Sequence, residues 1–328
     1  MSKQWVACAV RDAVLAYVEM ITGRTALRLS QMLKMIGIRK GKYSQWKKRL
    51  GKVNTHNSAL PKRHHLLLWE KQAIIVYARQ HYSDNDFFLR DGYRRLSYRM
   101  LDENIVAVSP SSVYRVLHTA GLLNRWKTAK TSAKGSGFVQ PTAAHEHWHT
   151  DIKYINFLGT FLFLISVMDG CSRYIVHHEV RTTMTEYDVE LTLQRAKEQY
   201  PHAKPRIISD NGGQFISKEF QEFIKVIELT HIKTSVAYPQ SNGKLERFHR
   251  SIGMECLRVS SFITLEDARQ IIAQYIQQYN RRRLHSSLGY LTPEDVLAGR
   301  GEEKLGERKK KLELASVARM LEWGKRAA

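Results

Sequence analysis

Residues 205–215 read PRIISDNGGQF, and this stretch decides the fold of the second half of the chain. Ile207 and Ile208 lie in an apolar run that is short enough for a buried strand. The run leads to Asp210, and the two glycines that follow favour a tight turn. The pattern therefore predicts a buried strand that ends at a carboxylate.

Two further carboxylates have comparable settings. Asp151 lies in HWHTDIKYI, residues 147–155, an apolar and aromatic stretch that is typical of a strand. Glu246 lies in YPQSNGKLERFHRS, residues 238–251, where turn residues precede a pattern of helical period. There are 58 residues between Asp151 and Asp210 and 35 between Asp210 and Glu246. A strand, a strand end and a helix can bring three acids together. Converging carboxylates suit Mg²⁺, which takes hard oxygen ligands and keeps waters for substrate phosphates.

The charge of the chain is uneven. The 328 residues carry 52 Lys and Arg against 31 Asp and Glu, a net charge of +21, and leave room for two or three domains. Residues 1–140 hold 25 basic against 8 acidic side chains, or +17, and residues 141–328 hold 27 against 23, or +4. This division predicts that the first region grips a polyanion that the second region cuts. A membrane-surface or ribosomal protein would leave the three acids unexplained.

The cysteines and the hydropathy indicate a cytoplasmic, nucleoid-associated protein without a membrane partner. Cys8, Cys171 and Cys256 are scattered and form no CxxC pair, which favours a reducing compartment. We find no apolar run of 18 residues and no signal-peptide pattern in the sequence.

Residues 1–60 are predicted to form a helix-turn-helix domain. Apolar residues recur at helical spacing over 26–36, glycines interrupt the pattern at 37–41, and a basic helix is expected over 43–50. The second helix of such a pair enters the major groove of DNA. The candidate DNA contacts on it are Lys47, Lys48 and Arg49. A helical hairpin with a charged face would look similar, so both interpretations stay open here.

Residues 65–123 have a similar pattern of basic helices joined by a turn and are predicted to form a second helix-turn-helix domain. A basic amphipathic helix is expected over 92–101, and Ser109 and Pro110 are expected to open a second helix as N-cap and first helical residue. The candidate DNA contacts here are Arg94, Arg95 and Arg115.

Two segments outside the domains are basic. Residues 124–144 lack a hydrophobic period and are predicted to be a linker, in which Lys127 and Lys130 either follow a phosphate backbone or belong to a solvated tether. Residues 299–328 are predicted to be a charged, amphipathic helical tail that docks on the core or on a second subunit.

Residues 145–298 have the pattern of an α/β catalytic core. Strands are expected over 147–155, 160–168, 173–180, 205–209 and 230–236, and helices over 186–199, 217–227 and around Glu246. Three successive strands followed by alternating helices and strands is the order of a ribonuclease-H-like fold, a mixed five-stranded sheet with flanking helices.

The motifs in this order resemble the catalytic core of retroviral integrases and DDE-type transposases of bacterial insertion sequences. SDNGGQF (209–215) is similar to the second-acid motif of that family, AYPQSNGKLERFHRS (237–251) to its glutamate motif, and YNRRRLHSSLGYLTPEDVL (279–297) to the segment that closes the bacterial cores. The resemblance covers about residues 141–298. Retroviral integrases begin with a zinc-binding domain that needs a CxxC pair. This sequence has no CxxC pair, so the resemblance favours the bacterial transposases.

The resemblance implies phosphoryl transfer on double-stranded DNA with two Mg²⁺ ions, for which Mn²⁺ can substitute. Asp151 would bridge both ions, Asp210 would hold one and Glu246 the other. Water would cut at a transposon end, and the 3′-hydroxyl left there would attack target DNA. Joining two ends requires a homodimer or a higher homo-oligomer on DNA.

The Glu246 helix has a second set of candidate DNA contacts: Lys244, Arg247 and Arg250. At 100° per residue, Leu245, Phe248, Ile252 and Cys256 would form its buried stripe, and His249 and Arg250 would flank Glu246. Many relatives carry Lys or Arg seven positions after the glutamate, where this chain has Gly253. The glycine is expected to kink or end the helix.

Three alternatives stay open. His145, His147 and His149 are expected to share a strand face with Asp151, where they would bind zinc, assist the metal site or form a polar rim. The chain could be a DNA-binding regulator or targeting protein that keeps the fold without catalysis. It could also be a structure-specific nuclease, although paired helix-turn-helix domains favour a sequence-specific transposase.

Overall fold

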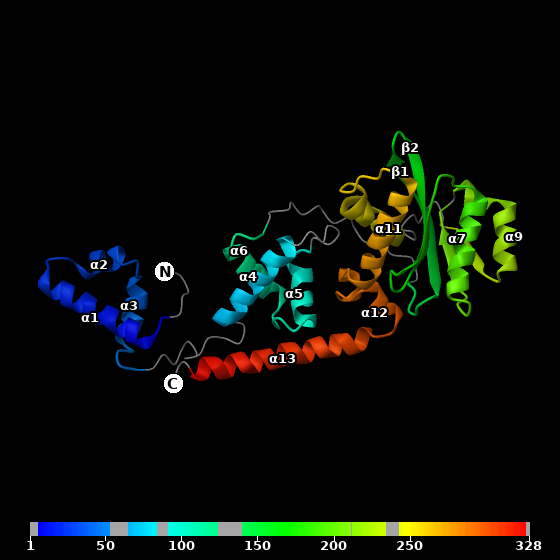
Figure 1. Ribbon diagram of the computed structural model, residues 1–328. Helices are drawn as coiled ribbons and strands as arrows, with labels where there is room; N and C mark the ends of the chain where they lie inside the picture. Colours follow the sequence, from blue (N-terminus) through cyan, green and yellow to red (C-terminus); the bar gives the residue numbers. More distant parts are fainter. Residues whose placement is uncertain are drawn as a thin grey trace. The chain divides into compact units, whose positions relative to one another are not determined.

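The computed structural model describes residues 6–52, 65–83, 91–123, 140–210, 212–233 and 243–325 (Figure 1). The chain divides into two compact units, residues 1–70 with 313–328, and residues 71–312. The predicted domains 1–60, 65–123, 124–144, 145–298 and 299–328 are successive segments, whereas the first compact unit joins the two ends of the chain. The assignment of these five segments as functional domains stays a prediction.

The first unit is helical, as the sequence indicates. It contains α1 (Cys8–Arg24), α2 (Leu29–Met35) and α3 (Lys40–Lys47), whose buried side chains form one small apolar core. Gly37, with φ +71°, lies between α2 and α3, a backbone conformation that favours glycine. The prediction of a helix over 43–50 is wrong at both ends, because α3 includes Lys40 and stops at Lys47. In the same unit, Arg319 donates to the buried carboxylate of Glu70 at 2.9 Å.

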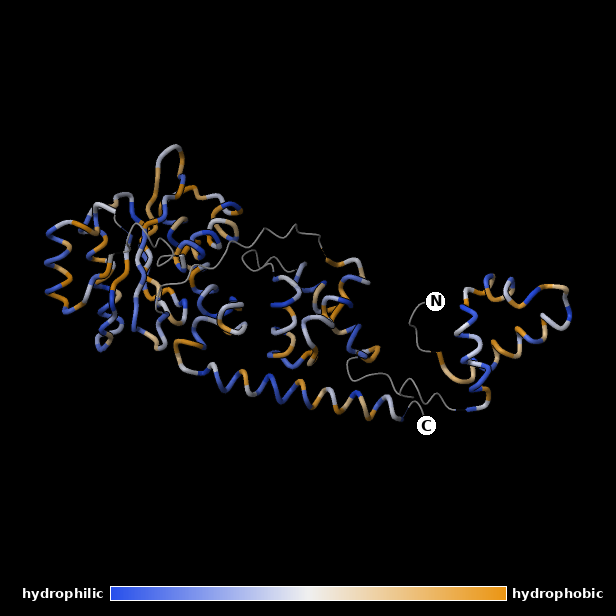
Figure 2. The backbone as a smooth tube through the Cα atoms, turned by 180° about the vertical axis from the view of Figure 1, so that it is seen from behind, coloured by the Kyte–Doolittle hydropathy of each residue, from blue (hydrophilic) through white to orange (hydrophobic). Residues whose placement is uncertain are grey.

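Helices α4 (Leu68–Ser83) and α13 (Gly301–Lys325) each contain residues of both units. The prediction of a helical tail is confirmed by α13. Its apolar side chains Leu314, Val317 and Leu321 are exposed, and hydrophilic and hydrophobic positions alternate along its length (Figure 2).

Two helices of the second unit follow α4 in the sequence, and the first of them is anchored to the rest of that unit. These are α5 (Tyr93–Asp102) and α6 (Pro110–Thr119), which starts with Ser109 as N-cap and Pro110 in its first turn, as predicted. Arg308 donates to both carboxylate oxygens of Asp102 at 2.7 Å. Tyr98 stacks on Tyr290 with ring centroids 4.5 Å apart. These long-range contacts fasten α5 to Arg308 of α13 and to Tyr290 within one unit.

A mixed five-stranded sheet forms the centre of the second unit. Its strands are β1 (His147–Phe157), β2 (Thr160–Asp169), β3 (Ile175–Arg181), β4 (Arg206–Ser209) and β5 (Thr230–Lys233). The strand order is β3-β2-β1-β4-β5; β1 to β3 are antiparallel, and β4 and β5 run parallel to β1. This topology is the ribonuclease-H-like fold that the order of elements predicts.

Helices cover both faces of the sheet (Figure 1). On one face, α10 (Gly243–Ile252) and α11 (Leu265–Arg281) pack on Ile155, Leu164 and Val180. On the other, α7 (Glu186–Gln199) and α9 (Lys218–Val226) pack on Trp148, Ile165 and Ile207. The remaining short elements are α8 (Gly213–Ile216), a π-helical segment (Gly253–Leu257), a 3₁₀ turn (Ser286–Leu288) and α12 (Pro293–Leu297).

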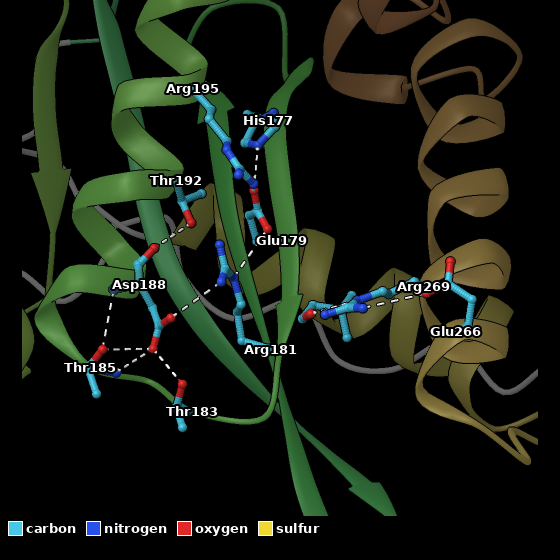
Figure 3. A network of polar contacts seen from close by, with 11 residues as sticks. His177, Glu179, Arg181, Thr183, Thr185, Asp188, Thr192, Arg195, Glu266 and Arg269 are labelled. Carbon is cyan, nitrogen blue, oxygen red and sulfur yellow. Dashed lines mark hydrogen bonds and ion pairs between the residues drawn. The ribbon is translucent and has the colours of Figure 1, made fainter.

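Polar side chains fasten helices to the edge strand β3 (Figure 3). Glu179 accepts hydrogen bonds from His177 and from Arg195 of α7. At the start of α7, Thr185 and Asp188 form a capping box. From the opposite face, Arg269 of α11 donates to the carbonyl of Val180 at 3.2 Å. The edge strand β3 is thus bonded to helices on both faces of the sheet, which stabilises the position of the sheet between them.

Candidate active site

Asp151 lies in the middle of the central strand β1, on the face that packs against α10. Its side chain is 20% exposed, and its Oδ1 accepts a hydrogen bond from the backbone N–H of Ile152 at 2.8 Å. Ile155, four residues further along the same strand face, belongs to the apolar core that includes Leu245 and Phe248 of α10. Alternation along β1 therefore directs the Asp151 carboxylate towards the layer that carries Glu246.

Asp210 follows β4, the strand next to β1. His149 pairs with Ile208, so Asp210 and Asp151 each lie two residues beyond a paired position on adjacent parallel strands. The Asp210 carboxylate is exposed and accepts from the N–H of Gly212 at 3.0 Å. A Cβ at Gly212 would come within 3.1 Å of Asp210 Oδ1, so a larger residue here would crowd the carboxylate.

Glu246 is exposed in the first turn of α10. The predicted buried stripe of this helix is confirmed, because Leu245, Phe248, Ile252 and Cys256 are all at most 1% exposed. The α-helix ends at Ile252 and π-helical geometry begins at Gly253, which confirms the prediction that the helix kinks or ends there. Burial on one side of α10 leaves the carboxylate of Glu246 on its open side.

The three carboxylates influence one another electrostatically. The pKa of Asp151 is raised to about 7, first by burial and then by the negative charges of Asp210 and Glu246. The Ile152 N–H and the Lys153 ammonium act in the opposite direction. Mutual repulsion of this kind would be relieved by a divalent cation, and the donors are the oxygen ligands that Mg²⁺ prefers. The residues therefore fit such an ion in chemistry and charge.

No set of three or more His, Cys, Asp or Glu side chains within the described ranges is already arranged to hold a metal ion. The acids would have to move closer together around an ion. The segments 211 and 234–242, next to Asp210 and before Glu246, lie outside the described residues.

His249, which the helical period places beside Glu246 on α10, lies against Asp151. His249 Nδ1 is 3.5 Å from Asp151 Oδ2, and burial followed by the charge of Lys153 lowers the pKa of His249 to about 3. The ring is neutral at physiological pH and can share a proton with the carboxylate without competing for cations. The helical period predicts its place beside Glu246. Its contact with Asp151 of β1 is new information from the structure.

The histidines before Asp151 do not form one row. The expectation for His145 is wrong, because this residue has φ +61° and precedes β1, and its Nδ1 accepts from the Trp148 indole at 3.1 Å. His147 and His149 are on the strand and buried. His149 packs closely against Gly170, since a Cβ there would lie 2.9 Å from its Nε2.

The candidate DNA contacts on α10 differ in accessibility. Lys244 donates to the carbonyl of Gly170 at 2.7 Å, and burial, followed by the charge of Arg173, lowers its pKa to about 7. It therefore ties the start of α10 to the β2–β3 turn. Arg247 and Arg250 are exposed on the same helix.

The candidate contacts in the helical regions also differ. Lys47 forms an ion pair with Glu19 at 3.0 Å, and Arg95 has its guanidinium mostly covered and paired with Asp91 at 3.3 Å. The exposed candidates are Lys47, Lys48, Arg94 and Arg115, and Arg49 is half-buried. Lys127 and Lys130 lie outside the described residues.

The raised pKa of Asp151 predicts a pH-dependent stability when divalent ions are removed. The folded-state pKa of about 7 exceeds the ordinary value of 3.8, so this contribution to stability is complete below about pH 4 and is lost as pH rises to 7. The loss should be on the order of 2 kcal/mol for a partly exposed group. Asp151→Asn should therefore raise the melting temperature in EDTA at pH 8 more than at pH 4. Equal effects of the substitution at both pH values would contradict this interpretation.

Comparisons with known proteins agree with this geometry. Two family models, both described as an integrase core domain, match residues 141–239 and 227–293. The transposase for insertion sequence element IS904 of Lactococcus lactis is 26% identical over 211 residues, which cover 60% of this chain and 83% of the relative. Transposase InsD of the insertion element IS2 of Escherichia coli is 27% identical over 244 residues, covering 67% and 81%.

Among solved structures, the HTLV-2 integrase catalytic core domain in complex with magnesium is 18% identical, with a TM-score of 0.36, and the match covers 47% of this chain and 97% of that one. Within the described residues, no helix is both long and apolar enough to cross a membrane.

Proposed function

We propose that this chain is a DDE-type transposase of a bacterial insertion sequence, with an integrase-like core, and that Asp151, Asp210 and Glu246 are its catalytic acids. The observation that carries the assignment is the placement of the three acids: Asp151 and Asp210 lie two residues beyond the paired His149 and Ile208 on adjacent parallel strands, and the helix of Glu246 packs on the sheet face of Asp151. The enzyme is a polynucleotidyl transferase that cleaves DNA and transfers the cut strand.

The acids would hold two divalent ions, which we propose to be Mg²⁺, with Mn²⁺ able to substitute. Such ions stabilise the charge on the attacking and leaving oxygens of an in-line phosphoryl displacement. The protein has three tasks around them. Asp151 presents a carboxylate that is costly to keep charged without a cation, which favours ion binding. The Gly212 N–H orients the Asp210 carboxylate, and His249 contacts Oδ2 of Asp151.

We propose double-stranded DNA as the substrate, both as the ends of a mobile element and as the target. Exposed Arg247 and Arg250 flank Glu246 and are suited to phosphates near the reacting strand. The basic helices of residues 1–123 would supply the binding of the element's ends, with exposed Lys48, Arg94 and Arg115 as contacts. Because two ends must be joined, we propose that the active form is a homodimer or a larger homo-oligomer.

Strand transfer with the full chain tests the proposal. An end duplex would first be selected by the protein from a random pool and then supplied pre-cleaved, with a free 3′-hydroxyl. Joining to a target plasmid is expected with Mg²⁺ or Mn²⁺ and not with EDTA. End binding without any joining in either metal would instead place the chain among DNA-binding regulators that keep the fold without the reaction.

A further inference from the structure

Lys153 is a half-buried lysine on the active-site face of the sheet. It follows Asp151 by two residues on β1, so both side chains point to the layer that contains α10. The central position of β1 in the sheet fixes the backbone of both residues. A cation is therefore held next to the most buried of the three acids.

Gly253 lies next to the end of the Lys153 side chain. A Cβ built on Gly253 would lie 3.9 Å from both Cε and Nζ of Lys153. Gly253 opens the π-helical segment that directly continues the helix of Glu246. The lysine thus spans from the strand of one catalytic acid to the end of the helix that carries another.

The electrostatics agree with this location. The positive charge of Lys153 acts to lower the pKa of both Asp151 and His249. Nevertheless, its ammonium forms no ion pair within 4.0 Å with any acid in the described parts of the chain. A cation that is held beside a catalytic carboxylate, without being paired to one, is available to an anionic ligand.

We propose that Lys153 binds a phosphodiester of the DNA strand that reacts at the acid triad. The inference rests on the proposed function, because it places the reacting strand at these acids. A phosphate fits the position, since it would be placed next to the metal-bound carboxylates and would receive a charge-assisted hydrogen bond from the ammonium. The competing role is that of an internal counter-ion, which would reduce repulsion among the acids without touching DNA.

The test compares four variants of the full chain. Lys153→Gln removes the charge, and Lys153→Arg keeps it. The double variant Lys153→Ala/Gly253→Lys moves the positive charge from β1 to the neighbouring position 253. A Cβ at position 253 would lie 3.9 Å from the Lys153 side-chain atoms, an ordinary contact distance. Lys225→Gln removes an exposed lysine from α9, on the opposite face of the sheet, and is the matched control.

Two readouts are needed. The first is the affinity for the pre-cleaved end duplex in Ca²⁺ at increasing salt, and the second is the single-turnover rate of strand transfer. Lys153→Gln is expected to weaken binding about five- to tenfold and to reduce the salt slope by about one, as for a lost phosphate contact. Strand transfer at subsaturating DNA should fall at least as much. Lys153→Arg and the double variant should recover most of both, and Lys225→Gln should change neither.

The counter-ion role predicts a different result. If Lys153→Gln leaves DNA affinity and salt slope unchanged while tightening Mn²⁺ binding, the lysine serves the acids alone and the proposal is overturned. The binding measurement decides this even if the unaltered chain shows no strand transfer, an outcome that would count against the proposed function instead.

Discussion

Replacing Asp210 with asparagine or Glu246 with glutamine is expected to slow DNA cleavage and strand transfer by at least about 10³-fold, which corresponds to about 4 kcal/mol in the activation barrier. Each change keeps the shape of the side chain but removes the charge with which it would hold a divalent ion. Both residues are exposed, so the fold should not depend on them. End-duplex binding in Ca²⁺ should stay within about threefold of the unaltered chain, because most of the net positive charge, +17 of +21, lies in residues 1–140.

Glu222→Gln is the matched control for these substitutions. It removes an exposed acid from α9, on the face of the sheet away from Glu246, and should leave strand transfer unchanged. Rates would be measured in a single turnover with pre-cleaved ends, alongside thermal unfolding of each variant. A rate within tenfold of the unaltered chain for Asp210→Asn or Glu246→Gln would disprove the assignment of that residue as a metal ligand.

Much of the catalytic fold could be predicted from local patterns. The apolar runs at 160–168 and 205–209 correspond closely to β2 and β4, and the expected helix over 186–199 is α7 to the residue. These segments have one strong periodicity, bounded by turn residues. By contrast, the start of α3 at Lys40 has no clear local signal, because its N-cap residue Arg39 makes no side-chain capping hydrogen bond and Gly41 lies in its first turn.

The site shows the same distinction between local and long-range information. The acids were found from their motifs and spacing, and the buried stripe of α10 from its period. The inward contact of Lys244 with Gly170 and the pairing of Arg95 with Asp91 were not predicted, because a basic residue on a helix surface looks the same whether or not a carbonyl or carboxylate faces it. The approach of Lys153 to Gly253 joins residues 100 positions apart and likewise left no local signal.

The junction after Glu246 is braced by a buried ion pair. Arg283 donates to both carboxylate oxygens of Glu255, at 2.6 and 2.9 Å, and to the hydroxyl of Ser251 at 3.3 Å. Tyr275 of α11 donates to the same carboxylate at 2.9 Å. Glu255 lies in the π-helical segment, where an irregular backbone needs support from outside the helix. This network therefore fixes the end of the helix that carries Glu246.

Arg283→Ala is expected to lower the free energy of unfolding by about 3 kcal/mol, because it leaves the largely buried carboxylate of Glu255 without its cation. The Arg283 side chain is 9% exposed and that of Glu255 21%. Strand transfer should also fall, since the helix that positions Glu246 would lose its brace. Urea unfolding at pH 7.5 measures the stability, and strand transfer well below the melting temperature measures the consequence for the site.

Two comparisons separate the brace from a general loss of charge. Lys204→Ala breaks an exposed pair with Glu228, whose side chains are 72% and 77% exposed, and should cost less than about 1 kcal/mol. Arg283→Met/Glu255→Gln removes both charges but keeps an acceptor for Tyr275, and should recover at least half of the lost stability, because no uncompensated buried charge remains. If Arg283→Ala were as mild as Lys204→Ala, the ion pair would not support the π-helical segment, and the position of Glu246 would depend on the apolar stripe of α10 alone.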